Sequence, residues 1–291
     1  MEDYSVLMSV YRGENPSHFR ASIQSMLDQT VPTNDFVLVC DGPLTDELDE
    51  TIDEFVTKRP FLFQIIRLQE NQGLGNALNV GIRYCKNNLI ARMDADDISL
   101  PDRCERELFE FNQNDKLDIV SGTILEFSSD PKQITVAKYL PETDVEIRSY
   151  AKRRCPFNHP CVMYRKEAVL KAGGYEDCPL FEDYHLWIRM LLNGSIGFNI
   201  QSPPLLLMRA NSDMYQRRGG VSYAIKALSF RTFMVRSGFC SKRDYLYTLF
   251  AHIVVSVMPN KIRKFIYKRY LRNSYDGVIT RKIAQEEYNN G

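Results

Sequence analysis

Three carboxylates follow an apolar run near residue 90. Asp94, Asp96 and Asp97 come directly after residues 89–93, which predict a buried strand. Ligands bind at the carboxyl ends of strands in open α/β sheets, and carboxylates this close repel one another unless a cation lies between them. Mg²⁺ is usually held by one or two carboxylates together with phosphate oxygens. The spacing therefore predicts a site for a divalent cation and a diphosphate. The alternative is an acidic turn that caps the next helix.

Two other predicted strands also end in polar groups. Tyr11 follows a strand at residues 4–10, and Asp41 follows one at 36–40. In a parallel sheet these ends and Asp94 meet at one edge, where Tyr11 could stack on a base and Asp41 could accept hydrogen bonds from a base or a ribose. A plain turn at Asp41 is the alternative. Gly73 precedes a helix and would let the backbone approach a ligand closely.

An acidic pair opens a later helix. Glu182 and Asp183 lie near the start of a helix predicted at 181–193, where the helix dipole stabilises carboxylates. One of them could serve as a general base, and ordinary first-turn acidity is the alternative. His159 precedes a strand predicted at 160–164 and is a further candidate for the same site.

Strands and helices alternate over the first 120 residues, which predicts right-handed βαβ units and a mostly parallel sheet. The strands are expected at 4–10, 36–40, 63–68 and 89–93, and the helices at 16–29, 45–57 and 75–84. Later helices are expected at 101–114, 144–152, 166–172 and 181–193, and strands at 118–127, 136–140, 160–164 and twice within 196–208. Residues 221–272 read as helical. We therefore expect an α/β fold, a Rossmann-like, mostly parallel central sheet with flanking helices, plus a C-terminal helical, basic extension.

The charge of the chain is unevenly distributed although the formal net charge is zero. Residues 1–221 carry 24 Lys/Arg and 33 Asp/Glu, whereas residues 222–272 carry 11 and 1. A basic arm after an acidic body indicates an anionic partner. The acidic body would repel nucleic acid, and apolar residues within 244–258 flanked by Lys/Arg are typical of a helix on anionic lipid. The alternative is a helix packed on the main domain with a solvated basic face.

Other sequence features limit the class of protein. Seven cysteines without a CxxC pair argue against a disulfide framework and for a reducing compartment. No run of about 18 apolar residues is present, so we expect no spanning helix. Met1 leads straight into a strand, so we expect no secretory leader. The sequence is compatible with an oligomer as well as with a monomer.

Taken together, these residues resemble the family 2 glycosyltransferases over about residues 5–208. The resemblance rests on the opening strand 5–11, Asp41-Gly42, Asn71-Gln72-Gly73 with Asn79, Met93-Asp94-Ala95-Asp96-Asp97 followed by Pro101-Asp102-Arg103, and Glu182-Asp183 with Trp187. The family's opening strand usually contains a proline and ends in Tyr-Asn. Residues 8–12 depart from that pattern, so we assign no role to Arg12.

The resemblance implies an A-type glycosyltransferase fold, a nucleotide-diphospho-sugar donor and inversion at the anomeric carbon. By position, Asp183 would be the base, Asp41 would meet the uracil or ribose, and Asp94 the ribose. Asp96 would bind Mn²⁺ or Mg²⁺, with Asp97 as a further candidate ligand. The remaining assignments are Tyr11, Asn71 and Gly73 at the donor, and Glu182, His159 and Trp187 at the acceptor.

The implied reaction moves a hexose, glucose or galactose, from a UDP-sugar to a lipid-pyrophosphate-linked saccharide in capsule, O-antigen or exopolysaccharide synthesis. We expect a peripheral enzyme on the cytoplasmic face of the membrane, with no nucleic-acid partner. A non-catalytic nucleotide-sugar sensor or scaffold is the alternative. The expected divisions are a catalytic domain at 1–220 (nucleotide half about 1–100, acceptor half about 101–220), a membrane-associating extension at 221–272 and a polar tail at 273–291.

Overall fold

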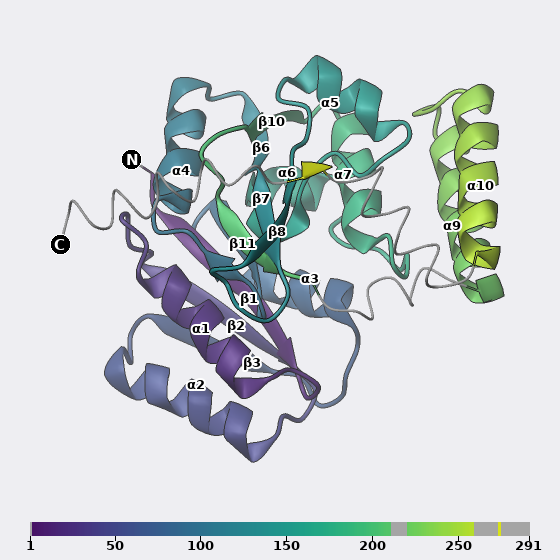
Figure 1. Cartoon of the computed structure of the whole chain (residues 1–291). Coiled ribbons are helices and arrows are strands. Elements are labelled where there is room, and N and C mark those ends of the chain that lie inside the picture. Colours follow the sequence, from purple (N-terminus) through teal and green to yellow (C-terminus); the bar gives the residue numbers. More distant parts are fainter. Residues whose placement is uncertain (1, 211–219, 259–272, 275–291) are drawn as a thin grey trace.

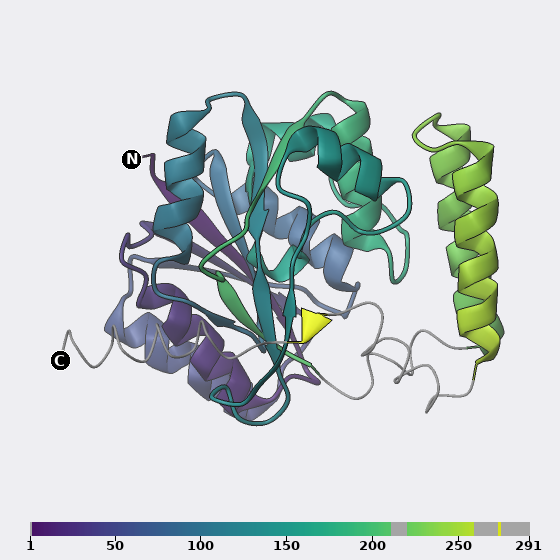
Figure 2. The same ribbon diagram turned by 45° about the horizontal axis from the view of Figure 1, so that its top comes forward.

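The computed structural model describes residues 2–210, 220–258 and 273–274. Two sheets form the body of the protein, and a pair of antiparallel helices stands at one side of it (Figure 1; Figure 2 shows the same arrangement after a 45° turn). Among the described helices, none has the length and apolar character that crossing a membrane requires.

The larger sheet has seven strands in the order β10-β6-β9-β4-β1-β2-β3. These are β1 (Tyr4–Tyr11), β2 (Asp35–Asp41), β3 (Phe63–Arg67), β4 (Leu89–Asp94), β6 (Leu117–Gly122), β9 (Met163–Arg165) and β10 (Ile196–Ile200). Strands β4, β1, β2 and β3 run parallel, as do β10 and β6, whereas β9 is antiparallel to both of its neighbours. The predicted mostly parallel α/β sheet is confirmed.

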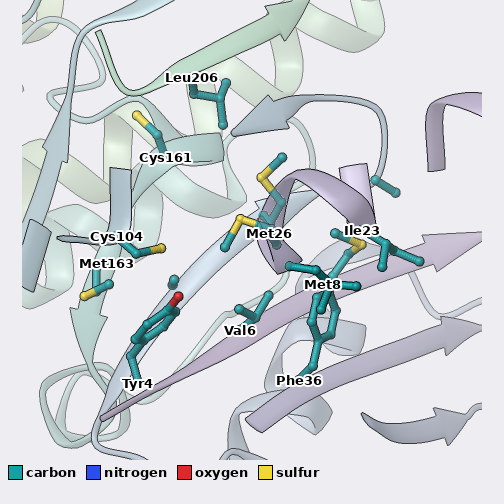
Figure 3. Close-up of a cluster of buried hydrophobic side chains, with 14 of the residues drawn as sticks. Tyr4, Val6, Met8, Ile23, Met26, Phe36, Cys104, Cys161, Met163 and Leu206 are labelled. Carbon is teal, nitrogen blue, oxygen red and sulfur yellow. The ribbon is translucent and has the colours of Figure 1, made fainter. Parts of the chain in front are cut away.

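Helices cover both faces of this sheet, which explains why its strands are continuously apolar. The side chains of α1 (Pro16–Leu27), α2 (Asp46–Lys58) and α4 (Arg103–Gln113) belong to one buried cluster, drawn in part in Figure 3. Those of α3 (Leu74–Tyr84), α5 (Asp144–Ala151), α6 (Lys166–Lys171) and α7 (Glu182–Leu192) belong to the other. Successive residues of β1 alternate between the two clusters, because side chains along a strand point to opposite faces.

A smaller sheet of five strands, ordered β12-β8-β7-β11-β5, lies beside the first. Its strands are β5 (Ile98–Ser99), β7 (Ile124–Phe127), β8 (Ile134–Lys138), β11 (Leu206–Arg209) and β12 (Asn273–Ser274). The prediction of one strand at 118–127 was wrong, because the chain changes sheets at Thr123. The backbone of Thr123 bonds to Ile200 O and Leu205 N, both at 2.9 Å. A continuous apolar run gives no sign of such a crossing.

Two other segments differ from expectation. The strand predicted at 160–164 begins as a 3₁₀ turn at His159–Cys161, and only then enters β9. The helix predicted from residue 221 is two helices, α9 (Gly220–Arg236) and α10 (Lys242–Val257). They are separated by Gly238 at φ +75°, a conformation that glycine adopts readily, and by the N-cap Ser241. The rest of that prediction, residues 259–272, lies outside the described residues.

Candidate active site

The acidic turn lies where the strand order of the larger sheet reverses. Strand β1 sits between β2 and β4, and Ser9 of β1 pairs with Asp94 of β4. On the other side of β1, Tyr11 pairs with Asp41 at the end of β2. Ligands of open α/β sheets bind in the crevice at such a switch point. The three strand ends singled out in the sequence thus share one edge.

Asp94 is held by a buried cation. Arg92 is 1 % exposed, and its Nη1 donates to Asp94 Oδ2 at 2.6 Å. The same oxygen lies 3.6 Å from His159 Nε2. None of the described residues accepts a hydrogen bond from Arg92 Nε or Nη2. The protein itself therefore balances and orients the Asp94 carboxylate.

Asp96 and Asp97 are crowded by like charges. Burial raises the pKa of Asp96 to about 7, with further contributions from Asp94 and Glu14. Burial also raises the pKa of Asp97, whose Oδ1 accepts from the backbone N–H of Arg209 at 2.7 Å. Within the described part of the chain, no three His, Cys, Asp or Glu side chains could hold a metal ion by themselves. Two carboxylates that share their ion with a diphosphate suffice for Mg²⁺ or Mn²⁺, so the donor set fits such an ion.

Asp41 fixes the glycine loop. Its Oδ1 accepts from Gln72 N at 2.7 Å and its Oδ2 from Gly73 N at 3.0 Å. Asn71 Nδ2 donates to the backbone oxygen of Asp41 at 3.2 Å. Gly42 has φ +86°, and a Cβ at this position would lie 2.7 Å from Asn71 N. The sequence predicted a nucleotide contact for Asp41, and the structure adds that Asp41 shapes the loop beside it.

A tyrosine orients Asp183 at the start of α7. Tyr175 OH donates to Asp183 Oδ1 at 3.3 Å. The backbone of Tyr175 is clamped by Asn79 of α3, which accepts from Tyr175 N at 2.7 Å and donates to Tyr175 O at 2.6 Å. Gly174 makes the clamp feasible, because a Cβ there would lie 2.5 Å from Asn79 Oδ1. Sequence reasoning missed Tyr175, and only the adjacent glycine pair 173–174 could have signalled this tight turn.

Contacts connect the start of α7 with α3 and with β4. Glu182, whose pKa is raised by burial, approaches the start of α3, where a Cβ at Gly75 would lie 3.8 Å from Glu182 Cγ. Asp94 and Asp183 both interact electrostatically with Arg92. Asp41, Asp94 and Asp183 are therefore linked through shared neighbours at one edge of the sheet.

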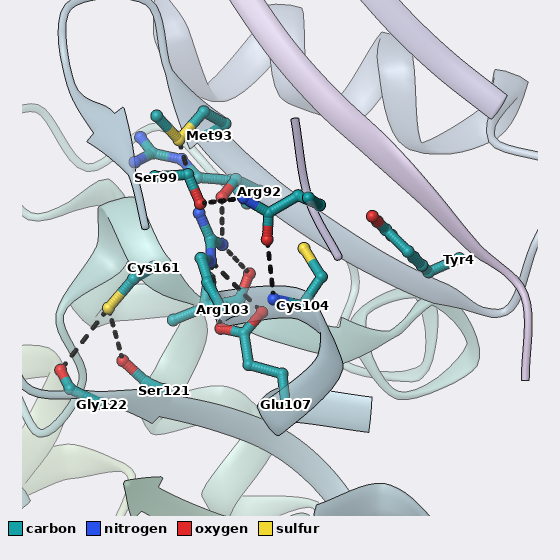
Figure 4. A network of polar contacts seen from close by, with 12 residues as sticks. Tyr4, Arg92, Met93, Ser99, Arg103, Cys104, Glu107, Ser121, Gly122 and Cys161 are labelled. Carbon is teal, nitrogen blue, oxygen red and sulfur yellow. Dashed lines mark hydrogen bonds and ion pairs between the residues drawn. The ribbon is translucent and has the colours of Figure 1, made fainter. Parts of the chain in front are cut away.

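Arg103 bonds to the strand that leads into the acidic turn, and Figure 4 shows it beside Arg92 and Glu107. It is fully buried and donates to Arg92 O at 2.8 Å and to Pro160 O at 3.2 Å, while its Nε lies 3.3 Å from Glu107. Burial raises the pKa of Glu107 to about 7. In the sequence Arg103 was only a marker of the resemblance. The structure shows that it joins β4 to the turn that carries His159.

Trp187 lies elsewhere than expected. It is fully buried in the core, where its ring meets Phe157 edge-on at 5.8 Å between centroids. A side chain enclosed in this way does not reach an acceptor, so the orienting role predicted for it is not carried forward.

Comparison with known proteins identifies relatives of the whole chain. Residues 5–173 match the family described as Glycosyl transferase family 2. An Escherichia coli UDP-Gal:alpha-D-GlcNAc-diphosphoundecaprenol beta-1,3-galactosyltransferase is 35 % identical over 92 % of this chain and 96 % of its own. The amylovoran biosynthesis glycosyltransferase AmsE of Erwinia amylovora is 34 % identical over 91 % of this chain and 98 % of its own.

Solved structures agree on the fold. The mannosyltransferase PcManGT from Pyrobaculum calidifontis, in complex with GDP-Man and Mn²⁺, superposes with a TM-score of 0.63 at 14 % identity, covering 99 % of this chain and 80 % of its own. S. aureus TarS in complex with UDP-GlcNAc gives 0.62 at 13 % identity, covering 94 % and 74 %. The chain belongs to glycosyl transferase family 2, and it is a glycosyltransferase with the A-type fold.

Proposed function

We propose that this enzyme transfers a hexose, glucose or galactose, from a UDP-sugar to a saccharide on a lipid pyrophosphate, with inversion and with the help of Mn²⁺ or Mg²⁺. The product would be a precursor of a surface polysaccharide such as capsule, O-antigen or exopolysaccharide. One observation carries the proposal, namely the convergence of Asp41, Asp94, Asp96 and Asp183 at one sheet edge. The printed name of the E. coli relative, which specifies UDP-Gal and a diphosphoundecaprenol acceptor, supports the substrate class.

The reaction assigns one task to each side chain. The acceptor hydroxyl gives its proton to Asp183, while its oxygen forms a bond to the anomeric carbon and the bond from that carbon to the diphosphate breaks, releasing UDP. Such proton transfer typically contributes about 10²–10⁴-fold to the rate. Tyr175 holds Asp183 in place by donating to its Oδ1. A divalent ion at Asp96 and Asp97 would neutralise the charge that develops on the diphosphate.

The test measures UDP release from UDP-glucose and UDP-galactose with lipid-pyrophosphate saccharides as acceptors. We expect Asp183→Asn to lower kcat by roughly 10²–10⁴-fold while UDP binding persists. Asp96→Ala should abolish Mn²⁺-dependent UDP binding. Asp177→Asn is the matched control, since this residue is exposed and precedes the site. Full activity of both Asp96→Ala and Asp183→Asn would refute the site. Metal-dependent UDP binding without turnover on any acceptor would favour the sensor.

We propose further that the outer face of the α9–α10 hairpin lies on an anionic membrane surface, on the cytoplasmic side. Both helices expose apolar side chains at helical spacing, with Phe250 70 % exposed. The exposed apolar residues are Val221, Ile225 and Leu228 of α9 and Leu246, Tyr247, Phe250 and Ile253 of α10. Lys242 and Arg243 stand exposed at the start of α10. Apolar residues next to basic ones are the pattern of an interfacial helix.

Co-sedimentation with vesicles tests this surface. Vesicles of phosphatidylcholine with phosphatidylglycerol should bind the protein more tightly than phosphatidylcholine alone. Phe250→Ser should weaken binding by about tenfold or more, because burying a Phe side chain is worth about 1.5–3 kcal/mol. Phe61→Ser, at an exposed phenylalanine in another part of the fold, is the control. Equal binding by the native chain and Phe250→Ser would rule out this face.

A further inference from the structure

The inner face of the α9–α10 hairpin meets α7 at the residue next to the proposed base. Phe181 is the N-cap of α7 and directly precedes Glu182 and Asp183. Its ring stacks on Phe230 of α9, with 4.8 Å between centroids and 18° between planes, and on Tyr223 at 6.1 Å. His252 of α10 meets the same ring edge-on at 5.8 Å. Both helices of the hairpin therefore close on one side chain.

The backbone that leads into Phe181 needs this support. Leu180 has φ +74°, and among the described residues it is the one non-glycine with a positive φ. The left-handed conformation costs a residue with a Cβ about 1–2 kcal/mol. Such strain persists only where the surroundings hold it in place, and it clusters at functional sites. Two interactions adjoin the strained residue, namely the bond from Phe181 N to Cys178 O at 2.9 Å and the aromatic contacts of the Phe181 ring.

Hydrogen bonds fix the side chains around Phe181. Arg231 of α9 is buried and donates to Arg153 O at 2.8 Å, and its guanidinium lies over the Tyr184 ring at 5.3 Å. Its Nε lies 3.3 Å from His252 Nε2. Because a guanidinium only donates, His252 Nε2 accepts, and the proton on Nδ1 faces Tyr223 OH at 2.8 Å. The residues that enclose Phe181 are thus held in one arrangement.

We propose that Phe181 is a positioning residue through which the α9–α10 hairpin sets the location of Asp183. The inference rests on the proposed function, because it takes Asp183 as the base. Phe181 lies two residues before Asp183, and the ring contacts that hold it come from Tyr223, Phe230 and His252 of the hairpin rather than from the loop at 71–75 or the turn at 94–97. Loss of the stack should therefore slow transfer and leave donor binding intact. A misplacement of about 1 Å can cost roughly 100-fold in rate.

The experiment compares Phe181→Ala and Phe230→Ala, which remove the stack from its two sides. With the full chain, Mn²⁺, UDP-galactose or UDP-glucose and a lipid-pyrophosphate GlcNAc acceptor, we expect kcat to fall by about 10–100-fold in both variants. The donor KM and the Kd for UDP should change by less than about threefold, since a lost transition-state contact leaves ground-state binding alone. Phe181→Tyr keeps the flat ring and should retain most of the native kcat. Phe61→Ala, at an exposed phenylalanine, is the matched control.

The outcomes separate this inference from the function on which it rests. Native kcat in Phe181→Ala together with an inactive Asp183→Asn would overturn the positioning role and leave the base in place. An active Asp183→Asn would overturn the base itself. A fall in UDP affinity that parallels the fall in kcat would show general damage and would also overturn the inference. If Phe181→Ala does not fold, Phe181→Leu is judged by the same results.

Discussion

The Arg92–Asp94 pair should dominate the stability of the site, and the two partners should contribute unequally. Arg92 is 1 % exposed, whereas the side chain of Asp94 is 22 % exposed and also has His159 within 3.6 Å. Asp94→Ala removes the single acceptor that the described residues offer the guanidinium. Arg92→Met removes the buried charge together with two nitrogens, Nε and Nη2, whose N–H groups have no described acceptor. Truncation of Asp94 should therefore be the more damaging change.

The magnitudes follow from burial. Breaking a buried pair costs about 3–5 kcal/mol, which is our expectation for Asp94→Ala, because the guanidinium keeps its electrostatic interaction with Asp183 but loses its one hydrogen-bond acceptor among the described residues. Arg92→Met leaves a partly solvated carboxylate and should cost about 1–2 kcal/mol, near the value of one lost charge-assisted hydrogen bond. The double variant contains neither charge and should be about as stable as Arg92→Met. The coupling energy of the pair then equals the cost of Asp94→Ala, about 3–5 kcal/mol.

Urea unfolding followed by tryptophan fluorescence measures these differences. The chain has a single tryptophan, Trp187, and its ring is fully buried, so its emission reports loss of the core. The matched control is the pair Arg67–Asp49, which has the same 2.6 Å separation but lies at the surface, with 49 % and 36 % of its side chains exposed. Exposed pairs couple by about 0.2–1 kcal/mol. Additive effects of Arg92→Met and Asp94→Ala, or a cost of Asp94→Ala below that of Arg92→Met, would refute the reasoning.

Three further predictions concern the acidic turn, a buried histidine of α7 and the glycine loop. Asp96→Asn should raise the melting temperature of the metal-free enzyme, because it removes repulsion among the acidic residues of the turn. The same change should abolish stabilisation by Mn²⁺ with UDP. An unchanged melting temperature of the metal-free enzyme would contradict this. Burial, with a contribution from Arg189, lowers the pKa of His185 to about 4, so protonation favours the unfolded chain. The free energy of unfolding should therefore fall by roughly 2–3 kcal/mol as the pH drops from 6.5 to 4. Chemical denaturation at the two pH values would measure this fall, which should be smaller in His185→Phe. Gly42→Ala should weaken UDP binding in calorimetry, because its Cβ would displace the 71–73 loop. Gly194→Ala is the control: Gly194 has φ +89° and open space around it, so this change should introduce backbone strain and leave UDP binding unchanged.

The fold was largely predictable because the first 120 residues alternate apolar strands with amphipathic helices at standard spacing. The parallel strands β1 to β4 and the common edge of Asp41 and Asp94 follow from that order. The crossing at Thr123 was not predictable, since a strand that changes sheets keeps its apolar pattern. The break at Gly238 was missed for a similar reason, because helical spacing continues on both sides of it.

The sequence proposes the carboxylates of the site but not the residues that hold them. Asp183 is a candidate from its place at a helix start and from the family resemblance, whereas Tyr175 and Asn79 meet across 96 residues and show no local pattern. Arg92 stands in an apolar strand, and nothing in the sequence pairs it with Asp94. Trp187 was misassigned because an aromatic residue at helical spacing after an acidic pair fits an acceptor contact and a core position equally well.

The acidic turn is fastened at both of its ends, which has a consequence for how the donor is received. Asp94 ends a strand of the larger sheet, and β5, directly after Asp97, pairs with β11 of the smaller one. Arg209 N in β11 also bonds to Asp97. Backbone amides here should exchange with solvent as slowly as those of the core, unlike those of most ligand-binding loops. Little chain entropy is then lost when the nucleotide arrives, so the carboxylates meet it already in place.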